Sequence, residues 1–371
     1  MSALSDITTF ARTGTATYVD SDGVLQTAAD GVPRTAHHLW DGTAWVNAGL
    51  LLESEARTNL FPFSTDLDNI TWTGASFGVT VTDDAGVAPD GSTTAARVQG
   101  LTSFRVYADS LTLSAGQAIT ISVWVKSNIS LDQEFQLLID DAIVSGDKTA
   151  TQEWQRFSFS ATTTSGTASL FGIADNVAGD TYDLLIWGPQ LEVGATPSSY
   201  IPTTGTTATR NAETLTIASA DAPWSDTAVS IQMEGTVTYA DTNNAGEAEF
   251  FLWEADPSNR IRAQLRTDSF REGAPYFAQR QAGVLDFSLG PASSYRPGIN
   301  VPFNIASRHG STFINGAVNG TSLTVDTTPT ALPDLSTTDI GIGPTFMGTI
   351  KLFRIWAEDI GDVGIASASS T

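Results

Sequence analysis

Hydrophobic and polar residues alternate along much of this chain with a period of two, the pattern of β-strands that bury one face. In the clearest case Ile119, Ile121, Val123 and Val125 share one face. The opposite face is polar apart from Trp124. The alternation therefore predicts a strand with one face in a core and the other at a surface.

Similar short segments recur along the chain, separated by Gly, Asp, Asn and Ser, which favour turns. Strands are predicted at residues 16–19, 25–27, 38–40, 45–46, 50–53, 77–81, 95–99, 104–108, 118–126, 133–139, 155–161, 168–173, 181–192, 229–239, 248–254, 260–266, 276–281, 301–308, 311–314, 339–342 and 348–356. Their spacing predicts an all-β chain, with an N-terminal β segment followed by two β-sandwich (jelly-roll) domains.

A chain of 371 residues is too long for one ordinary core and suits two or three domains. Residues 1–62 are too few to fold alone, so we expect them to borrow the next domain, a symmetry mate or a larger particle as a partner. Residues 63–202 form the first predicted sandwich, residues 203–212 a Thr-rich linker, and residues 213–371 the second sandwich. The incomplete N-terminal segment also predicts a homo-oligomer.

The net charge of the chain limits the classes of partner that we expect it to bind. There are 41 acidic and 18 basic residues, which give a formal net charge of -23. Nucleic acid and anionic lipid would be repelled by such a surface, so we expect neither as a partner. The charge suits a protein displayed in many copies, and it suits an ordinary acidic extracellular surface equally well.

The chain contains no cysteine, which excludes disulfides, zinc–thiolate sites and thiol catalysis. No apolar stretch approaches membrane-spanning length, and residues 1–6 do not resemble a signal peptide. We therefore expect synthesis in the cytoplasm, without membrane insertion. A role outside the cell would need another exit, such as release with a particle.

Several motifs indicate a known family. Tyr18 to Gly23 reads Tyr-x-Asp-x-x-Gly, and residues 50–60 read LLLESEARTNL. Residues 190–192 read Gln-Leu-Glu, and residues 199–203 read Ser-Tyr-Ile-Pro-Thr. These segments resemble virion spike and tail-fibre proteins of phages and of phage-like gene transfer agents, whose jelly-roll modules bind carbohydrate.

The last predicted sandwich carries a second resemblance. Residues 346–356, FMGTIKLFRIW, resemble the closing strand of concanavalin A-like lectin or laminin-G-type sandwiches. Residues 312–316, TFING, resemble a hairpin of those folds that turns at Asn-Gly.

Together the resemblances imply a non-catalytic adhesion protein of a virion, either a head spike or a tail fibre. The N-terminal segment would anchor the chain to other virion proteins, and the sandwiches would bind host capsular or surface polysaccharide. Many copies would convert weak contacts into avidity. Two interpretations stay open beside this one: a polysaccharide depolymerase, and a capsid decoration or baseplate part that uses the sandwiches as spacers.

Candidate catalytic residues are few. Glu247 and Glu249 share a strand face, and such a pair can approach the separation of roughly 5 Å that retaining glycosidases use. The Glu-x-Asp-x-x-Glu string of concanavalin-like hydrolases is absent, however. His37 and His38 point to opposite sides of a strand, and His309 is remote in sequence. No nucleophile elbow or phosphate loop occurs, so the sequence predicts a protein without enzymatic activity.

The resemblance to sugar-binding jelly rolls also implies a structural calcium ion. Hard oxygen ligands are available from Asp83, Asp84, Asp140, Asp141 and Asp180. No calcium-loop spacing is present, so acidic turns are the alternative.

Sugar receptors stack the C–H faces of a sugar on aromatic rings and hold its hydroxyls with polar side chains. Arg105 and Tyr107 share one face of a predicted strand, and Trp124 stands among polar neighbours. Trp154 lies at a strand entrance. These four residues are predicted glycan contacts, with a core or rim role as the alternative for Trp154.

Arg260 and Arg262 extend the predicted contacts into the last sandwich. With Arg266 they keep strand parity, so they can form one basic strip on an acidic protein. The strip would bind an acidic polysaccharide or pair with acidic residues of a neighbouring subunit. Neutralisation of local carboxylates is the alternative.

Overall fold

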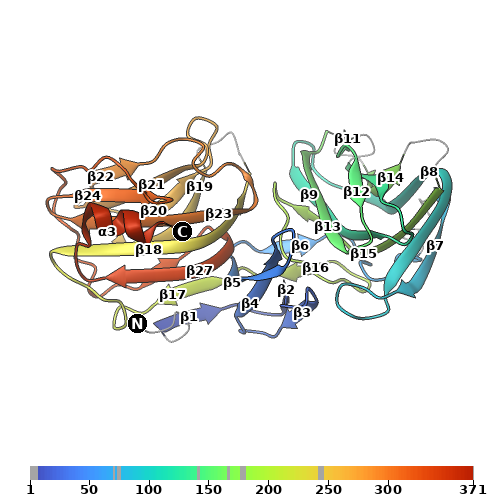
Figure 1. The fold of residues 1–371 in the computed structure, drawn as a ribbon, viewed down its shortest axis with the longest axis horizontal. Coiled ribbons are helices and arrows are strands. Elements are labelled where there is room, and N and C mark those ends of the chain that lie inside the picture. Colours follow the sequence, from blue (N-terminus) through green and yellow to red (C-terminus); the bar gives the residue numbers. More distant parts are fainter. Residues whose placement is uncertain are drawn as a thin grey trace. The chain divides into compact units, whose positions relative to one another are not determined.

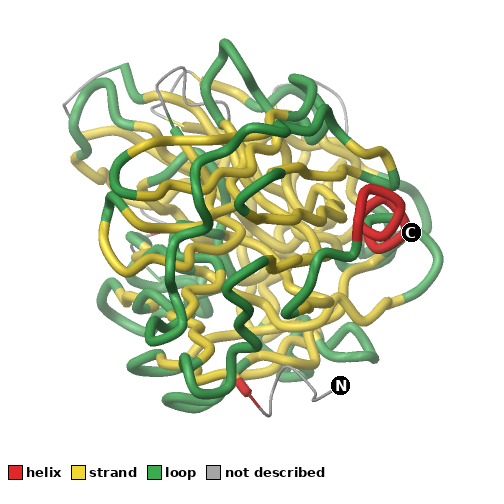
Figure 2. The backbone as a smooth tube through the Cα atoms, turned by 90° about the vertical axis from the view of Figure 1, so that its left-hand side faces the viewer, coloured by secondary structure: helices red, strands yellow, loops and turns green. Residues whose placement is uncertain are grey.

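The structure is a computed structural model that describes residues 7–69, 72, 77–139, 143–164, 168–175, 181–240 and 246–370. Almost all of its regular structure is strand, as Figure 2 shows, which confirms the predicted all-β class. The helix α3 (Gly361–Ala368) lies near the C-terminus. In the described part of the chain, no helix is long and apolar enough to cross a membrane.

The chain divides into two compact units (Figure 1). The C-terminal unit comprises residues 1–15, 28–56 and 211–371, and the middle unit comprises residues 16–27 and 57–210. The structure thus distributes the N-terminal segment over both units, whereas the sequence predicts a separate part at residues 1–62.

Hydrogen bonding explains this difference, because isolated strands need partners and other strands of each unit supply them. β1 (Thr8–Ala11) pairs with β17 (Thr214–Ile217), and β6 (Arg57–Asn59) pairs with β16 (Ala208–Arg210). Part of the predicted linker at residues 203–212 is therefore strand. The strands of the N-terminal segment pair with other strands of the same chain, so they do not need a second subunit. The homo-oligomer stays a prediction.

Two seven-stranded antiparallel sheets form the C-terminal unit. The first sheet has the order β1, β17, β26 (Ile340–Ile342), β19 (Glu247–Asp256), β20 (Asn259–Arg266), β21 (Ala274–Gln281), β22 (Val284–Leu289). The second has the order β25 (Thr321–Ser322), β24 (Ile314–Val318), β23 (Gly298–Gly310), β18 (Ala228–Tyr239), β27 (Met347–Trp356), β5 (Trp45–Glu53), β4 (Arg34–Trp40). Residues of both sheets share one core; Phe250 and Phe303, for example, lie with ring centroids 4.5 Å apart. This is the arrangement of a β-sandwich.

Strand alternation decides which side chains leave this core. On β18, Ile231 and Met233 are buried between the sheets, while Gln232 and Glu234 lie on the opposite face. On β27, Phe353 belongs to the core and its neighbours alternate in the same way. The outer face of the second sheet is therefore predictable from the sequence once the strands are known.

The predicted Asn-Gly turn at residues 312–316 is wrong. Asn315 and Gly316 lie inside β24, where they pair with Arg308 and Ser307 of β23. A Cβ on Gly316 would come 2.1 Å from the ring of Phe277, so this glycine permits close packing of the two sheets. Another Asn-Gly pair makes the turn between β24 and β25: residues 319 and 320 have φ angles of 46° and 81°.

One nine-stranded sheet system dominates the middle unit. Its strands are β7 (Phe77–Gly86), β8 (Ala95–Thr112), β9 (Ala118–Ser127), β10 (Gln133–Ile139), β11 (Ile143–Val144), β12 (Lys148–Ala150), β13 (Gln155–Thr162), β14 (Ala168–Asp175) and β15 (Thr181–Val193). A short hairpin joins β2 (Ala16–Val19) to β3 (Leu25–Ala28). β8 is one long strand instead of the two predicted; its first part pairs with β15 and its later part with β14.

The predicted core face of β9 is confirmed: Ile119, Ile121, Val123 and Val125 all enter the core of the middle unit. The opposite face, predicted to lie at a surface, is buried as well, and Tyr200 of the segment at residues 196–203 packs against Trp124 there. Trp124 is 8% exposed on that covered face.

Three sequence motifs of the middle unit build a polar latch, which we define as Arg57, Asn59, Gln190, Glu192 and Ser198. The Glu192 carboxylate accepts hydrogen bonds from the Ser198 amide (2.9 Å), the Ser198 hydroxyl (2.7 Å) and Gln190 Nε2 (2.8 Å). Asn59 Nδ2 donates to the Ile201 carbonyl at 2.9 Å. The LLLESEARTNL, Gln-Leu-Glu and Ser-Tyr-Ile-Pro-Thr motifs are thus joined by buried hydrogen bonds.

A buried ion cluster, which we define as Arg12, Arg34, Glu53 and Glu213, holds the C-terminal unit. Glu213 Oε1 lies 2.8 Å from Arg12 Nη1, and its Oε2 lies 2.7 Å from Arg34 Nη2. Arg34 also contacts Glu53 at 2.8 Å. Burial disfavours the charged guanidinium of Arg34, but Glu53 and Glu213 outweigh that effect and raise its pKa. The N-terminal motif residues therefore have a structural role.

Candidate functional site

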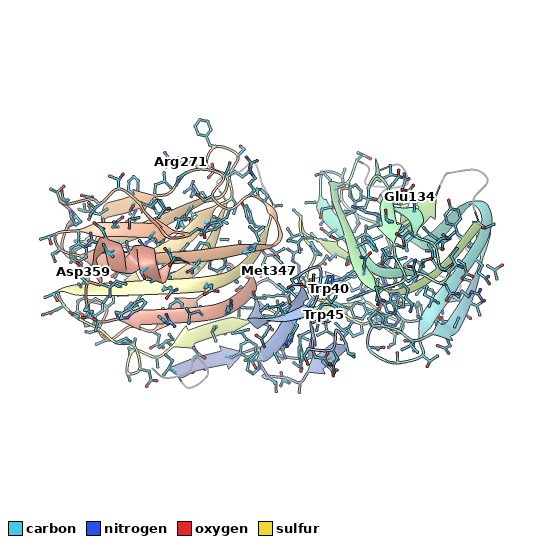
Figure 3. The ribbon with its side chains drawn as sticks, viewed as in Figure 1. Trp40, Trp45, Glu134, Arg271, Met347 and Asp359 are labelled. Carbon is cyan, nitrogen blue, oxygen red and sulfur yellow. The ribbon has the colours of Figure 1, made fainter. Side chains whose placement is uncertain are left out.

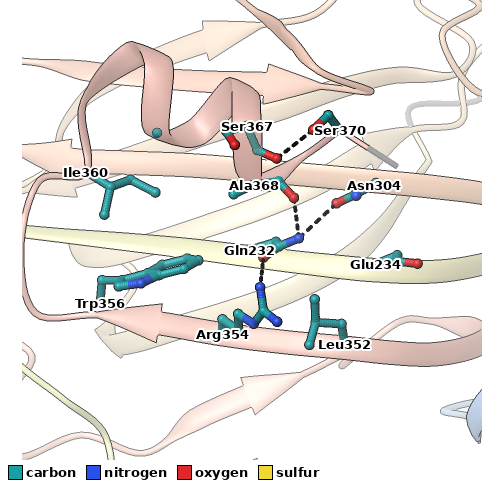
Figure 4. Close-up of a pocket in the computed structure, with 11 residues that line it drawn as sticks. Gln232, Glu234, Asn304, Leu352, Arg354, Trp356, Ile360, Ser367, Ala368 and Ser370 are labelled. Carbon is teal, nitrogen blue, oxygen red and sulfur yellow. Dashed lines mark hydrogen bonds between the residues drawn. The ribbon is translucent and has the colours of Figure 1, made fainter. Parts of the chain in front are cut away.

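A groove on the outer face of the second sheet of the C-terminal unit is the strongest candidate site (Figure 4). It lies between β18, β23 and β27 on one side and α3 on the other, and its volume is about 480 Å³. That volume is within the usual range for small-molecule sites. Its lining consists of Gln232, Glu234, Asn304, Leu352, Arg354, Trp356, Ile360, Gly364, Ser367, Ala368 and Ser370.

Register and alternation bring these side chains together. Arg354 of β27 pairs directly with Gln232 of β18, and Leu352 pairs with Glu234. Trp356 follows Arg354 by two residues and therefore shares its face. The groove thus combines an aromatic ring, a guanidinium, amides and a carboxylate on adjacent strands.

Gln232 links the sheet to the helix at the floor of the groove. Its Nε2 donates to the Ala368 carbonyl at the end of α3 and to Asn304 Oδ1 at 3.3 Å. Its Oε1 accepts a long contact of 3.5 Å from Arg354 Nη1. Gln232 and Asn304 are each only 2% exposed, whereas Ser367 and Ser370 of the helix side are exposed.

The helix α3 forms one wall of the groove, and ion pairs hold its N-terminal end against the sheet. Arg308 of β23 donates to Asp359 at 2.9 Å and to Asp362 at 2.8 Å. Ile365 of α3 packs on Ala306 and other small residues of the sheet. The groove is therefore preorganised, which lowers the entropic cost of holding a ligand.

The charges of the groove suit binding rather than acid–base catalysis. Its described lining residues include a single carboxylate, Glu234, whose Oε1 lies 2.9 Å from Lys351 Nζ. Glycoside hydrolysis normally uses a pair of carboxyl groups across the scissile bond. The described lining of this groove does not supply such a pair.

Trp124, predicted as a glycan contact, lies in an aromatic cluster of the middle unit. Its ring centroid is 5.5 Å from that of Trp187 and 5.3 Å from that of Tyr200. The Arg156 guanidinium lies 4.6 Å from its centroid. These neighbours leave little of the ring for a ligand, so the burial does not favour its predicted role.

Trp154 is half-buried beside this cluster. Its Nε1 donates to the Val87 carbonyl at 3.1 Å, and Lys126 Nζ lies 5.4 Å from its ring centroid. This position fits the rim role given as the alternative. Glycan contact by Trp154 stays a prediction.

Arg105 and Tyr107 lie on β8 with a described backbone, but their side chains fall outside the described residues. Asp140, Asp141 and Asp180 also fall outside them. Their predicted contacts with glycan or calcium remain predictions.

The predicted arginine strip lies on the outer face of the first sheet, a different sheet from that of the groove. Arg260 contacts Glu254 at 2.9 Å, and Arg262 lies 3.2 Å from Glu247 and 3.6 Å from Glu249. Burial raises the pKa of Glu249, and Arg262 partly opposes that rise. Local carboxylates therefore neutralise these two arginines, as the alternative prediction holds, and a glycan contact by Arg260 or Arg262 stays a prediction.

Two of the three histidines are buried. Burial lowers the pKa of His37 to about 4 and that of His309 to about 3, so both rings are neutral at physiological pH. They lie on β4 and β23, which are not neighbours in the second sheet.

Three carboxylates of the middle unit could hold a cation. The ligand oxygens of Asp66, Asp68 and Asp83 lie within 4.8 Å of one another. Asp83 is the one calcium candidate from the sequence that the structure places in this cluster. Burial, followed by repulsion from Asp68 and Asp66, raises the pKa of Asp83 from 3.8 to about 6.

This shift predicts a pH-dependent effect of Asp83→Asn. A carboxyl group whose pKa is raised by folding stabilises the protein below pH 3.8, and that contribution is lost as the pH rises through about 6. At pH 8 the variant should therefore be more stable than the parent by about 1 kcal/mol, after allowance for solvent screening. At pH 3.5 the two should unfold alike in urea.

The same variant tests the expected calcium ion. A carboxylate binds calcium more strongly than an amide oxygen does, so bound calcium would make Asp83→Asn the less stable protein at pH 8. Urea unfolding curves of both proteins are measured in roughly millimolar calcium and in chelator, at equal ionic strength. They show whether Asp83→Asn is the more stable or the less stable protein at pH 8.

The groove was missed by sequence reasoning, although one signal for it was present. Arg354 and Trp356 belong to the Phe-Arg-Ile-Trp stretch of the lectin-like closing strand, and alternation places them opposite Phe353 and Ile355. What the sequence lacked was the pairing of β27 with β18 and the position of α3.

Comparisons with known proteins give only distant similarity. No protein-family model and no curated protein matches the chain. Among solved structures, the botulinum neurotoxin serotype D binding domain is 11% identical with a TM-score of 0.33, over 46% of this chain and 43% of that one. The CBM22-1-CBM22-2 tandem domain of Paenibacillus barcinonensis Xyn10C is 13% identical with a TM-score of 0.28, over 81% and 97%.

Mouse laminin α1 domains LG4-5 are 10% identical with a TM-score of 0.25, over 68% of this chain and 85% of that one. The chain spans less than half of the toxin domain that it matches. TM-scores this low establish no common family, so the fold assignment rests on the sheet topology of this chain.

Proposed function

We propose that the protein is a non-enzymatic carbohydrate-binding protein and that the groove beneath α3 is its binding site. The observation that carries this proposal is the combination of Trp356 and Arg354 with the exposed hydroxyls of Ser367 and Ser370 along one groove, whose floor is fixed by Gln232. An aromatic ring offers a stacking surface for sugar C–H groups, and the guanidinium and hydroxyls offer directional partners for sugar hydroxyls.

We further propose that this binding serves adhesion of a virion to host capsular or surface polysaccharide. The support for this finer role is the resemblance of residues 50–60 and 190–203 to phage and gene-transfer-agent spike and fibre proteins. Display in many copies would convert a weak groove into tight attachment. The high negative charge would keep such copies apart and soluble.

Trp356→Ala is expected to weaken binding of the best glycan about ten-fold, because it removes the stacking surface. The measurement is titration calorimetry of the full chain, after a glycan array has ranked acidic and neutral polysaccharide fragments. Trp356→Phe keeps a ring and should retain most of the affinity.

Trp40→Ala is the matched control. Trp40 is 54% exposed and lies 5.5 Å from Trp45 across the β4–β5 hairpin (Figure 3). The proposal fails if Trp40→Ala abolishes binding while Trp356→Ala preserves it. A chain that binds no glycan would support the spacer interpretation, and release of reducing ends from polysaccharide would support the depolymerase interpretation.

A further inference from the structure

We propose that the groove selects an acidic sugar, whose carboxylate pairs with Arg354 while its ring lies against Trp356. This inference names the ligand class of the proposed glycan site and rests on that proposed function. A neutral sugar would occupy the same groove without using its guanidinium.

Arg354 differs from most of the described strand arginines of this unit, because it contacts no described carboxylate; Arg280, which donates to the Pro257 carbonyl at 3.3 Å, shares this property. Arg260, Arg262 and Arg308 each contact a carboxylate within 3.2 Å. Arg354 has no carboxylate partner among the described residues; its contact is the 3.5 Å approach of Nη1 to Gln232 Oε1. The Nη donors of a guanidinium held this way remain available for a carboxylate.

The local charge also favours an anion. Among the described lining residues the one carboxylate, Glu234, is balanced by Lys351 at 2.9 Å, so Arg354 remains as their uncompensated charge. The net charge of -23 opposes an anionic ligand at long range. At physiological ionic strength, charges more than about 8 Å away are largely screened, so the nearby guanidinium has the larger effect.

The spacing of the two side chains matches one sugar residue. Arg354 and Trp356 lie two positions apart on one face of β27, which separates their Cα atoms by about 7 Å. In a hexuronic acid the carboxylate projects from the ring edge, so the ring can lie against the indole while the carboxylate reaches the guanidinium. The exposed hydroxyls of Ser367 and Ser370 border the groove from α3 and can meet the sugar hydroxyls.

The test compares oligosaccharides of uronic acids with the same oligosaccharides after chemical reduction of their carboxyl groups, on the full chain by titration calorimetry. An array of acidic and neutral glycans first selects the uronic-acid series that binds best. We expect reduction of the carboxyl groups to weaken binding at least about ten-fold. Arg354→Gln should remove this preference, and Arg354→Lys should retain part of it because the charge remains.

Arg260→Gln, on the other sheet, is the matched control and should leave the preference unchanged. Equal binding of acidic and reduced oligosaccharides, a preference for neutral glycans, or full acidic preference in Arg354→Gln would overturn this inference while leaving carbohydrate binding intact. Failure of every glycan on the array to bind would overturn the proposed function and this inference together.

Discussion

Glu213→Ala is expected to destabilise the C-terminal unit by about 3–5 kcal/mol, because it breaks a buried ion cluster from its centre. Glu213 contacts both Arg12 (2.8 Å) and Arg34 (2.7 Å), and all three side chains are fully buried. Its Oε2 also accepts a hydrogen bond from the backbone amide of Glu53 at 2.8 Å. Without it, the Arg12 guanidinium keeps carbonyl contacts and loses its contact with Glu213, and Arg34 keeps its contact with Glu53.

Hydrogen exchange measured by mass spectrometry tests this prediction locally, since peptides from β18 and β27 report on the C-terminal unit alone. Glu254→Gln is the control: its partner Arg260 is on a partly exposed sheet face, where an ion pair is worth about 1 kcal/mol or less. Equal exchange in the two variants would show that the buried cluster does not hold this unit.

Glu192→Ala is expected to have the second-largest effect, a loss of about 3 kcal/mol in the middle unit. Its buried carboxylate is the acceptor for Ser198 and Gln190 in the latch, and Arg57 Nη1 lies 3.8 Å from it. Loss of the carboxylate would remove the acceptor of the Ser198 backbone amide, weaken the hydrogen bonding of the Ser198 hydroxyl and of Gln190, and release the segment that covers Trp124.

Exchange in peptides from β9 and β15 measures this effect, and Trp fluorescence should change as the cover opens. Glu153→Gln, an exposed glutamate in the same unit, should leave both readouts unchanged. A Glu192→Ala protein with parental exchange would mean that the latch contributes little and that its motif has another role.

Strand positions were largely predictable from the sequence because alternation is a local property. Residues 133–139, for example, match β10 throughout, and the core face of β9 was identified correctly. The division of the N-terminal segment between two units was not predictable, because strand pairing depends on contacts between residues distant in sequence. Arg12 and Glu213, 201 positions apart, illustrate this separation.

Burial of both faces of a strand explains why the structure does not favour the predicted glycan contact of Trp124. Alternation correctly put Trp124 opposite the core, but it could not show that residues 196–203 return to cover that face. The helix α3 was missed for a related reason. Its sequence, GDVGIASA, contains two glycines and has little apolar periodicity, so the helix depends on packing against the sheet.

Hydrogen exchange of the full chain, with and without its best-binding glycan, tests the central claim most directly, because it locates the ligand without a substitution. If glycan binds in the groove, exchange should become slower in residues 347–356 of β27 and 361–368 of α3 when glycan is present. Protection confined to the strand that carries Arg260 and Arg262, or to the surroundings of Trp154, would contradict that claim.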